Sequence, residues 1–200
     1  MASEGPNNPG TVVDDGSIGT RAWSNPSNAK VSDDQYATTS YMGTFSVYDE
    51  SVKIVKSDGS FGTEDKANKT TRWPSSDTYF SYGGATDLWS ETWTPSDINS
   101  SNFGVAIAAR SSAFGTTHYL KATNFGFSIP AGATINGILA EVEKKHSSNL
   151  YVDHIRITVY YTEGGAIEKS VSDVGSVSGS ISKANLILIG DQNLSGISYF

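Results

Sequence analysis

The sequence predicts an all-β fold, an antiparallel jelly-roll-like β-sandwich followed by an extended C-terminal arm. Three observations predict it: apolar and polar residues alternate along several short segments, turn-forming residues cluster between these segments, and helical periodicity hardly appears. The 200 residues are 11% aromatic and 18% charged, a composition typical of half-buried sheet surfaces. A chain of this length is expected to form one sandwich with a substantial core.

Five segments carry the strand pattern, with inward-facing residues at every second position. In chain order these residues are Val52 and Ile54; Phe103, Val105, Ile107 and Ala109; Phe125, Phe127 and Ile129; Ile138, Ala140 and Val142; and Ile155, Ile157, Val159 and Tyr161. On the last segment, His154 and Arg156 are expected on the outer face as surface cross-strand neighbours. Turns are expected at 57–60, 82–85, 130–132 and 147–149.

One helical turn is predicted at 94–98, because Thr94 can cap it and Pro95 would take the first helical position. The three asparagine and serine residues that follow end it. We therefore expect very little helix in the chain.

Three regions follow from these patterns: an N-terminal arm at 1–10, the sandwich at 11–163 and a C-terminal arm at 164–200. Glycine and proline in 1–10 predict an extended arm that orders only on a partner. The C-terminal arm is rich in Ser and Gly and carries one apolar segment that predicts an assembly strand, formed by Leu186, Ile187, Leu188 and Ile189. This strand has three alternative fates: it completes the chain's own sandwich, pairs with a neighbouring subunit, or docks on another partner.

Composition argues against several classes of function. The net charge of −7 and the absence of Lys and Arg clusters disfavour a nucleic acid or an anionic membrane as partner. With no cysteine, the chain has neither disulfides nor thiolate metal sites nor a Cys nucleophile. The sequence has neither a secretory signal nor a membrane-spanning apolar run, so we expect the protein to be made in the cytoplasm.

The sequence predicts a protein that is not an enzyme and needs no cofactor. Its three histidines lie far apart and lack the spacing of a zinc site. Glu141 and Glu143 share one strand face, which would suit a glycosidase or a calcium site, but the two lysines that follow favour a solvated sheet face. Calcium at the loop pairs Asp14–Asp15 and Asp33–Asp34 is a weaker alternative.

The segment from Trp73 to Trp93 is the candidate recognition surface. Its rings are Trp73, Tyr79, Tyr82, Trp89 and Trp93, with Gly and Asp between them. Exposed aromatic rings stack on sugars while neighbouring polar groups complete the hydrogen bonds, so this segment is a candidate glycan-binding surface. The alternative is that the rings fill the sandwich.

Most of residues 8–163 resembles a module found in bacteriophage structural proteins and in environmental bacterial surface proteins. The resemblance rests on the segments NPGTVVDDGSIGTRAWSNPSNAKVSDDQYAT, SVKIVKSDGS, YGGATDLWSETWTPSDINSSNFGVAIAAR, YLKATNFGFSIPAGATINGILAEVEKK and VDHIRITVYYTE. In that module the YLKATN segment precedes SVKIVKSDG, whereas here it follows Arg110, so strand order is expected to differ. The resemblance implies a sandwich with structural or adhesive duty and carries over no catalytic residue.

Together these observations predict a non-enzymatic virion structural protein of a bacteriophage, either a capsid decoration (cement) protein or a tail component. It would stabilise an assembly through sandwich contacts and its C-terminal strand. The expected partners are other copies of the chain and virion proteins such as a capsid or tail protein, and the expected location is the virion. The alternative is a glycan-binding adhesin module that uses the Trp73–Trp93 surface.

Overall fold

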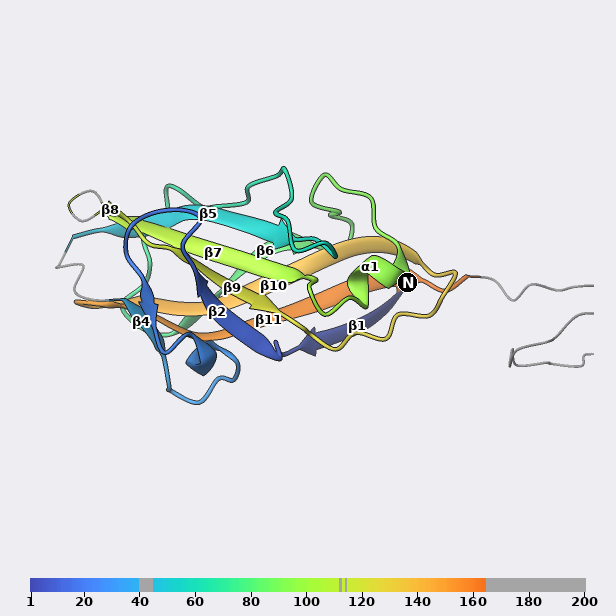
Figure 1. Ribbon diagram of the computed structural model, residues 1–200, viewed down its shortest axis with the longest axis horizontal. Helices are drawn as coiled ribbons and strands as arrows, with labels where there is room; N and C mark the ends of the chain where they lie inside the picture. Colours follow the sequence, from blue (N-terminus) through green and yellow to red (C-terminus); the bar gives the residue numbers. More distant parts are fainter. Residues whose placement is uncertain (40–44, 112, 114, 165–200) are drawn as a thin grey trace, which may run out of the picture. The chain divides into compact units, whose positions relative to one another are not determined.

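The computed structural model describes residues 1–39, 45–111, 113 and 115–164, which form two antiparallel sheets packed face to face (Figure 1). This arrangement confirms the predicted all-β sandwich. The strands are β1 (Ala2–Asn7), β2 (Thr11–Asp15), β3 (Trp23–Ser24), β4 (Ala37–Thr39), β5 (Val47–Val55), β6 (Thr78–Gly84), β7 (Gly104–Ser111), β8 (Gly115–Thr116), β9 (Tyr119–Thr123), β10 (Thr134–His146) and β11 (Leu150–Thr162). The predicted assembly strand, 186–189, and the rest of the C-terminal arm beyond Gly164 lie outside the described residues.

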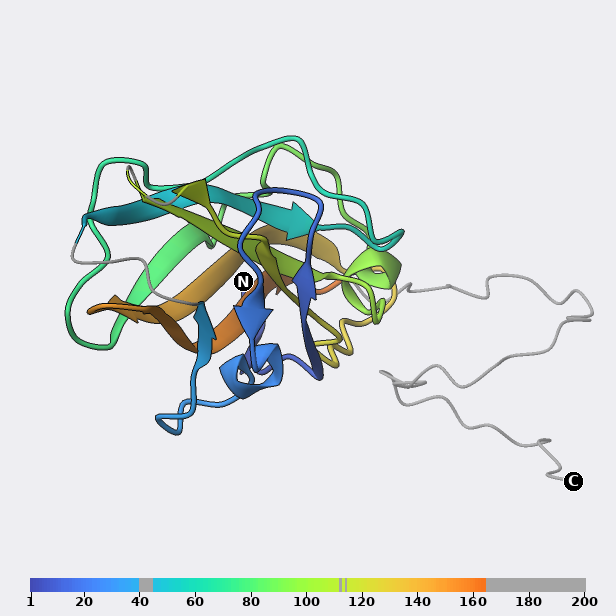
Figure 2. The same cartoon turned by 60° about the vertical axis from the view of Figure 1, so that its left-hand side comes forward.

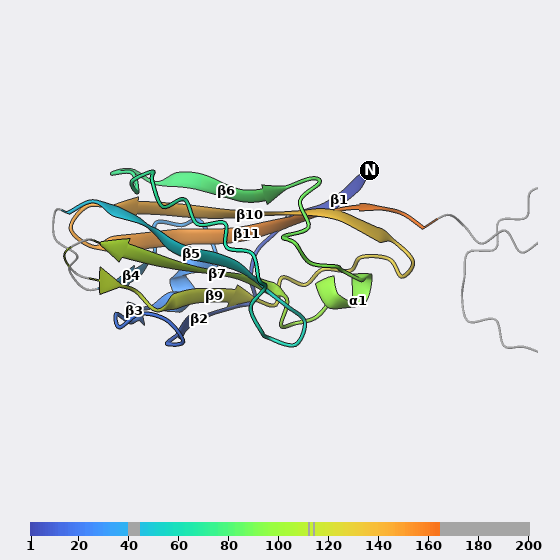
Figure 3. The same ribbon diagram turned by 90° about the horizontal axis from the view of Figure 1, so that it is seen from above.

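Sheet A has the strand order β3-β4-β11-β10-β6, and sheet B has the order β2-β9-β7-β5 with the short β8 beside β7. The chain crosses between the sheets after β1, β2, β4, β5, β6 and β9, and Figure 3 shows the two layers from above. The long hairpin β10–β11 forms the middle of sheet A and turns at the predicted residues 147–149.

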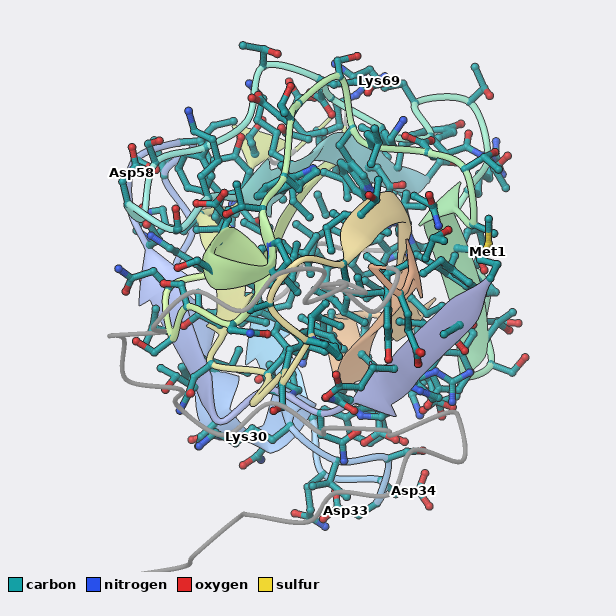
Figure 4. All side chains as sticks on the ribbon, turned by 90° about the vertical axis from the view of Figure 1, so that its right-hand side faces the viewer. Met1, Lys30, Asp33, Asp34, Asp58 and Lys69 are labelled. Carbon is teal, nitrogen blue, oxygen red and sulfur yellow. The ribbon has the colours of Figure 1, made fainter. Side chains whose placement is uncertain are left out.

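Apolar side chains from alternate positions fill the space between the layers (Figure 4). On β10 the predicted inward residues Ile138, Ala140 and Val142 are all fully buried. On β11 the first three predicted residues are fully buried, and the fourth, Tyr161, is partly buried against the core. The period-two pattern therefore identified the core faces of this hairpin correctly.

Two short helical segments complete the fold. The 3-10 helix η1 (Pro26–Ala29) packs against β2 and β4 (Figure 2). The predicted helical turn is α1 (Pro95–Ile98), and its start is held by a capping box in which Thr94 and Asp97 bond each other's backbone N–H groups.

The N-terminal segment differs from the predicted arm. Residues 2–7 form β1, which pairs antiparallel with β11 and brings Ala2 opposite Tyr161. β4 pairs with the other end of the same β11 edge, at Leu150 to Val152. The reason is that β4 is short, so the rest of that edge offers unpaired backbone groups, which an extended segment of the chain itself satisfies.

The predicted strand at Phe125 to Ile129 is also absent. Asn124 and Gly126 adopt left-handed backbone conformations, with φ of 60° and 68°, which interrupt an extended strand. The apolar residues are nevertheless buried, because Phe127 packs edge-on against Phe103 and stacks on Phe125. Alternation here marked core residues on an irregular segment.

Candidate functional site

The aromatic segment predicted as a glycan-binding surface lies largely inside the sandwich. Trp73, Tyr82, Trp89 and Trp93 are at most 9% exposed, and Tyr79 is half-buried. The buried rings are held by bonds to internal acceptors: the indole N–H of Trp89 donates to the Ile138 carbonyl, and that of Trp93 to the Leu88 carbonyl. These four rings fill the core and leave no exposed face for a sugar, which corrects the predicted surface.

Two of the buried rings belong to an ionic cluster that joins the two sheets. Asp49 lies on β5 of sheet B, and Lys144 lies on β10 of sheet A; the Lys144 Nζ is 2.5 Å from Asp49 Oδ1. The Trp73 indole N–H donates to the same oxygen at 2.8 Å. The other oxygen, Oδ2, accepts from the Tyr82 hydroxyl at 2.8 Å and from the Asn68 backbone N–H at 3.0 Å. We call these five residues the inner cluster.

Aromatic rings surround the ammonium group of the inner cluster. Lys144 Nζ lies 4.4 Å from the ring centroid of Phe80, 4.7 Å from that of Trp73 and 5.2 Å from that of Tyr82. It also donates a hydrogen bond to the Tyr82 hydroxyl. Cation–π attraction of this kind is strongest where water is excluded, as it is here.

The inner cluster is almost completely shielded from solvent. The side chains of Lys144 and Asp49 are each 1% exposed. Burial lowers the pKa of Lys144 to about 8, although the charge of Asp49 acts in the opposite direction. Burial and then the charge of Asp49 raise the pKa of the Tyr82 hydroxyl, which therefore stays protonated and available as a donor.

The sequence predicts a solvated face for both lysines after Glu143, and for Lys144 this prediction is wrong. Its position continues the inward alternation of Ala140 and Val142, so the alternation along the strand indicated that this side chain points into the core. The charge of the side chain argued against burial because an isolated buried ammonium is costly. Its partner, Asp49, comes from a strand far away in the sequence, and no local pattern identified it.

A chemically similar cluster lies on the outer face of sheet A, around the next residue, Lys145. Lys145 Nζ is 2.8 Å from Asp77 Oδ2 and 2.7 Å from the Tyr36 hydroxyl, and it lies over the rings of Tyr36 and Tyr151. The Lys145 side chain is 21% exposed. Partial burial lowers its pKa, but the hydrogen bonds with Asp77 and Tyr36 outweigh that effect and leave the pKa above its ordinary value. We call these four residues the outer cluster.

The paired glutamates of β10 do not converge on one ligand position. Glu141 accepts from the Arg156 guanidinium at 2.8 and 3.2 Å, and Glu143 accepts from the Ser32 hydroxyl at 2.7 Å. Each carboxylate is thus engaged in a separate bond across the sheet surface. The predicted preference for an ordinary outer sheet face fits this geometry better than a glycosidase or calcium site.

The loop acids are likewise engaged locally. Asp14 accepts from the Trp23 backbone N–H and pairs with His118, while Asp33 accepts from a backbone N–H within its own loop. Figure 4 shows Asp33 and Asp34 projecting from the body of the sandwich. Across the described ranges, no group of three or more His, Asp or Glu side chains is arranged to hold a metal ion.

His154 is buried rather than on the exposed face that its alternation predicted. It is 6% exposed, its Nδ1 lies 2.8 Å from the Tyr79 hydroxyl and its Nε2 lies 2.9 Å from the Asn8 side-chain oxygen. The reason is that Tyr79 of β6 and Asn8, which follows β1, bond its two ring nitrogens and shield them from solvent. Burial, and then the charge of Arg156, lower the pKa of His154.

Comparisons with protein-family models, curated proteins and solved structures gave no match to this chain. Among the residues that the structure describes, no helix has the length and apolar character needed to cross a membrane.

Proposed function

We propose that the chain is a non-enzymatic structural protein of a bacteriophage particle, either a capsid decoration protein or a tail component. The observation that carries the proposal is that the ionisable side chains bond to other groups of the same chain. The buried ion pair of Asp49 and Lys144, the buried His154, and the pair of Glu141 and Arg156 all bond within the sandwich and tie its strands together. This use of polar groups suits a rigid building block.

The edges of the sheets support an assembly role. The outer side of β5 is covered by residues 61–73, whose backbone N–H groups bond the carbonyls of Val47, Val52 and Ile54. β6 is the edge strand at one end of sheet A. A terminal strand offers backbone groups to a strand from another chain, so β6 is the edge through which we propose that copies or virion partners contact this protein.

Light scattering behind a sizing column tests this proposal, with the full chain compared with a version that ends at Gly164. A defined oligomer for the full chain and a folded monomer for the shorter version would support assembly through the C-terminal arm. If both are monomers at high concentration, and neither associates with purified phage capsids or tails, the structural proposal is lost.

A glycan-binding function is the second candidate, and it now depends on a different surface. The half-buried rings of Tyr36 and Tyr151 meet edge to face on the outer side of sheet A, with Lys145 and Asp77 beside them. Rings next to polar groups are typical of sugar sites. A glycan array separates the two functions, because binding that is lost in Tyr151→Ala, with unchanged thermal stability, would favour the adhesin.

A further inference from the structure

The inner cluster contains every group needed to form an amide bond. It places a primary amine one hydrogen bond from a carboxyl group, with a hydroxyl in contact with both. The amine belongs to β10 of sheet A and the carboxyl group to β5 of sheet B, so a bond between them would connect the two layers covalently.

We propose that Lys144 Nζ condenses with the Asp49 carboxyl carbon, so that an intramolecular isopeptide bond cross-links the two sheets. The reaction joins groups of this chain alone and uses neither an oxidant nor an external acyl donor. It does not depend on the proposed function, because a cross-linked sandwich would suit any extracellular or particle-bound role.

The atoms of this reaction balance as a loss of water. One ammonium proton passes to Oδ1, which leaves a neutral amine and a neutral carboxylic acid. The Nζ lone pair then attacks the carboxyl carbon, and Oδ1 departs as water with a second proton from the nitrogen. The third proton remains on the amide nitrogen. Tyr82, which contacts both Nζ and Oδ2, can relay a proton during attack and collapse.

The donors around Asp49 suit the intermediate of this reaction. If Oδ1 leaves, Oδ2 becomes the amide oxygen and keeps the Tyr82 hydroxyl and the Asn68 backbone N–H as donors. The same two donors would stabilise the negative charge that develops on Oδ2 when the amine attacks, as an oxyanion hole does. The lowered pKa of Lys144 increases the share of neutral amine at neutral pH.

Burial also favours the product. An ion pair held away from water has lost the hydration of both charges, whereas an amide carries no charge and is easier to bury. Reversal requires water to enter a site whose side chains are 1% exposed. The outer cluster supplies a natural control. It has the same amine, carboxylate and hydroxyl groups in Lys145, Asp77 and Tyr36. Its ion pair is more exposed to water, because the side chain of Lys145 is 21% exposed and that of Asp77 is 24% exposed.

The intact mass of the purified full chain under denaturing conditions tests the proposal. The expected mass is that of the sequence less one water molecule. A tryptic map should contain a branched peptide that joins Asp49 to Lys144, with no cleavage after Lys144, while Lys145 and Asp77 remain unlinked. A folded chain with the full sequence mass, and linear peptides around both residues, would overturn the proposal.

Two controls keep the result unambiguous. The Asp58–Gly59 pair can also lose water by closing to a succinimide, but it then yields a linear peptide, so a mass loss without the branch counts against the proposal. Asp49→Asn should lose ammonia in place of water and form the same branch. The double variant Asp49→Asn with Lys144→Met keeps the cluster uncharged and should keep its full mass.

Discussion

Lys144 and Lys145 are neighbours in the chain but lie on opposite faces of β10, and the two faces give the same type of side chain very different environments. Each lysine bonds one aspartate and one tyrosine hydroxyl, and each lies over aromatic rings. The exposed fraction of the side chain is 1% for Lys144 and 21% for Lys145. The pKa is lowered to about 8 in the first and raised in the second.

The difference teaches that solvent, and not the choice of partners, sets the energetics of these two clusters. Water compensates for most of what a partly exposed ion pair gains or loses, so such pairs contribute little to stability. A fully buried pair has no such compensation, and the removal of one member leaves the other charge unpaired in the core. Substitutions at matched positions of the two clusters measure this contrast directly.

The largest contrast is expected between Lys144→Met and Lys145→Met. The first should lower the free energy of unfolding by at least about 3 kcal/mol, because Asp49 stays buried without its cation. The second should lower it by less than about 1 kcal/mol, as for exposed pairs. Chemical denaturation followed by tryptophan fluorescence measures both; equal losses would show that burial does not separate the clusters.

The tyrosines provide a second matched pair. Tyr82→Phe removes a donor to the buried Asp49 carboxylate and should cost about 1.5–3 kcal/mol, the range for hydrogen bonds to charged groups. Tyr36→Phe removes a hydroxyl that water can replace and should cost under about 1 kcal/mol. The same unfolding experiment applies, and a larger loss for Tyr36→Phe would contradict the comparison.

An acidic residue near the surface should show a smaller, pH-dependent effect. Hydrogen bonds from Thr94 and then Ser57 lower the pKa of Asp97. Its contribution to stability is therefore present above the unfolded pKa of about 3.9 and is lost as pH falls through the lower folded value. Asp97→Asn should lower the free energy of unfolding by about 1 kcal/mol at neutral pH, as the loss of other helix N-terminal caps does. The free energy of unfolding of the variant, measured by chemical denaturation at a series of pH values, should fall less steeply at acidic pH than that of the parent chain.

The smallest expected effect concerns His154, a second buried titratable group. It faces Tyr79 and Asn8, with Arg156, Glu141 and Glu143 nearby. Because its folded pKa is lowered, the unfolded chain binds the proton first, and stability should fall as pH drops below about 6.5. Thermal melts of His154→Gln at pH 5.5 and 7.5 should show a smaller difference than those of the parent chain.

The sequence predicted those parts of the fold that depend on patterns between residues close together in the chain. The alternation on β10 and β11 identified their core faces, and Thr94 with Pro95 located α1. The same alternation extended to Lys144, but its charge argued against burial, since the partner that compensates it lies on another sheet. Pairing of that kind depends on tertiary contact, which a single sequence does not reveal.

Two further differences have the same origin. The segment 1–10 has the composition of an extended arm, and it is extended, but its partner is β11 of the same chain. The buried aromatic rings of 73–93 have the composition of a recognition surface, and only their packing distinguishes a core from a binding face. In each case the residue types indicated the local conformation or the kind of side chain, but they did not indicate which part of the chain packs against the segment.

The pairing of β1 with β11 also bears on how the sandwich forms during synthesis. β1 is synthesised before the other strands that the structure describes, but it pairs with β11, which is synthesised after all of them, so that Ala2 lies opposite Tyr161. Contacts between residues so distant in sequence form slowly, whereas the β10–β11 hairpin needs only a short turn. Folding should therefore end with the docking of the N-terminal residues, and nascent chains stopped before β11 should remain sensitive to proteases at residues 2–7.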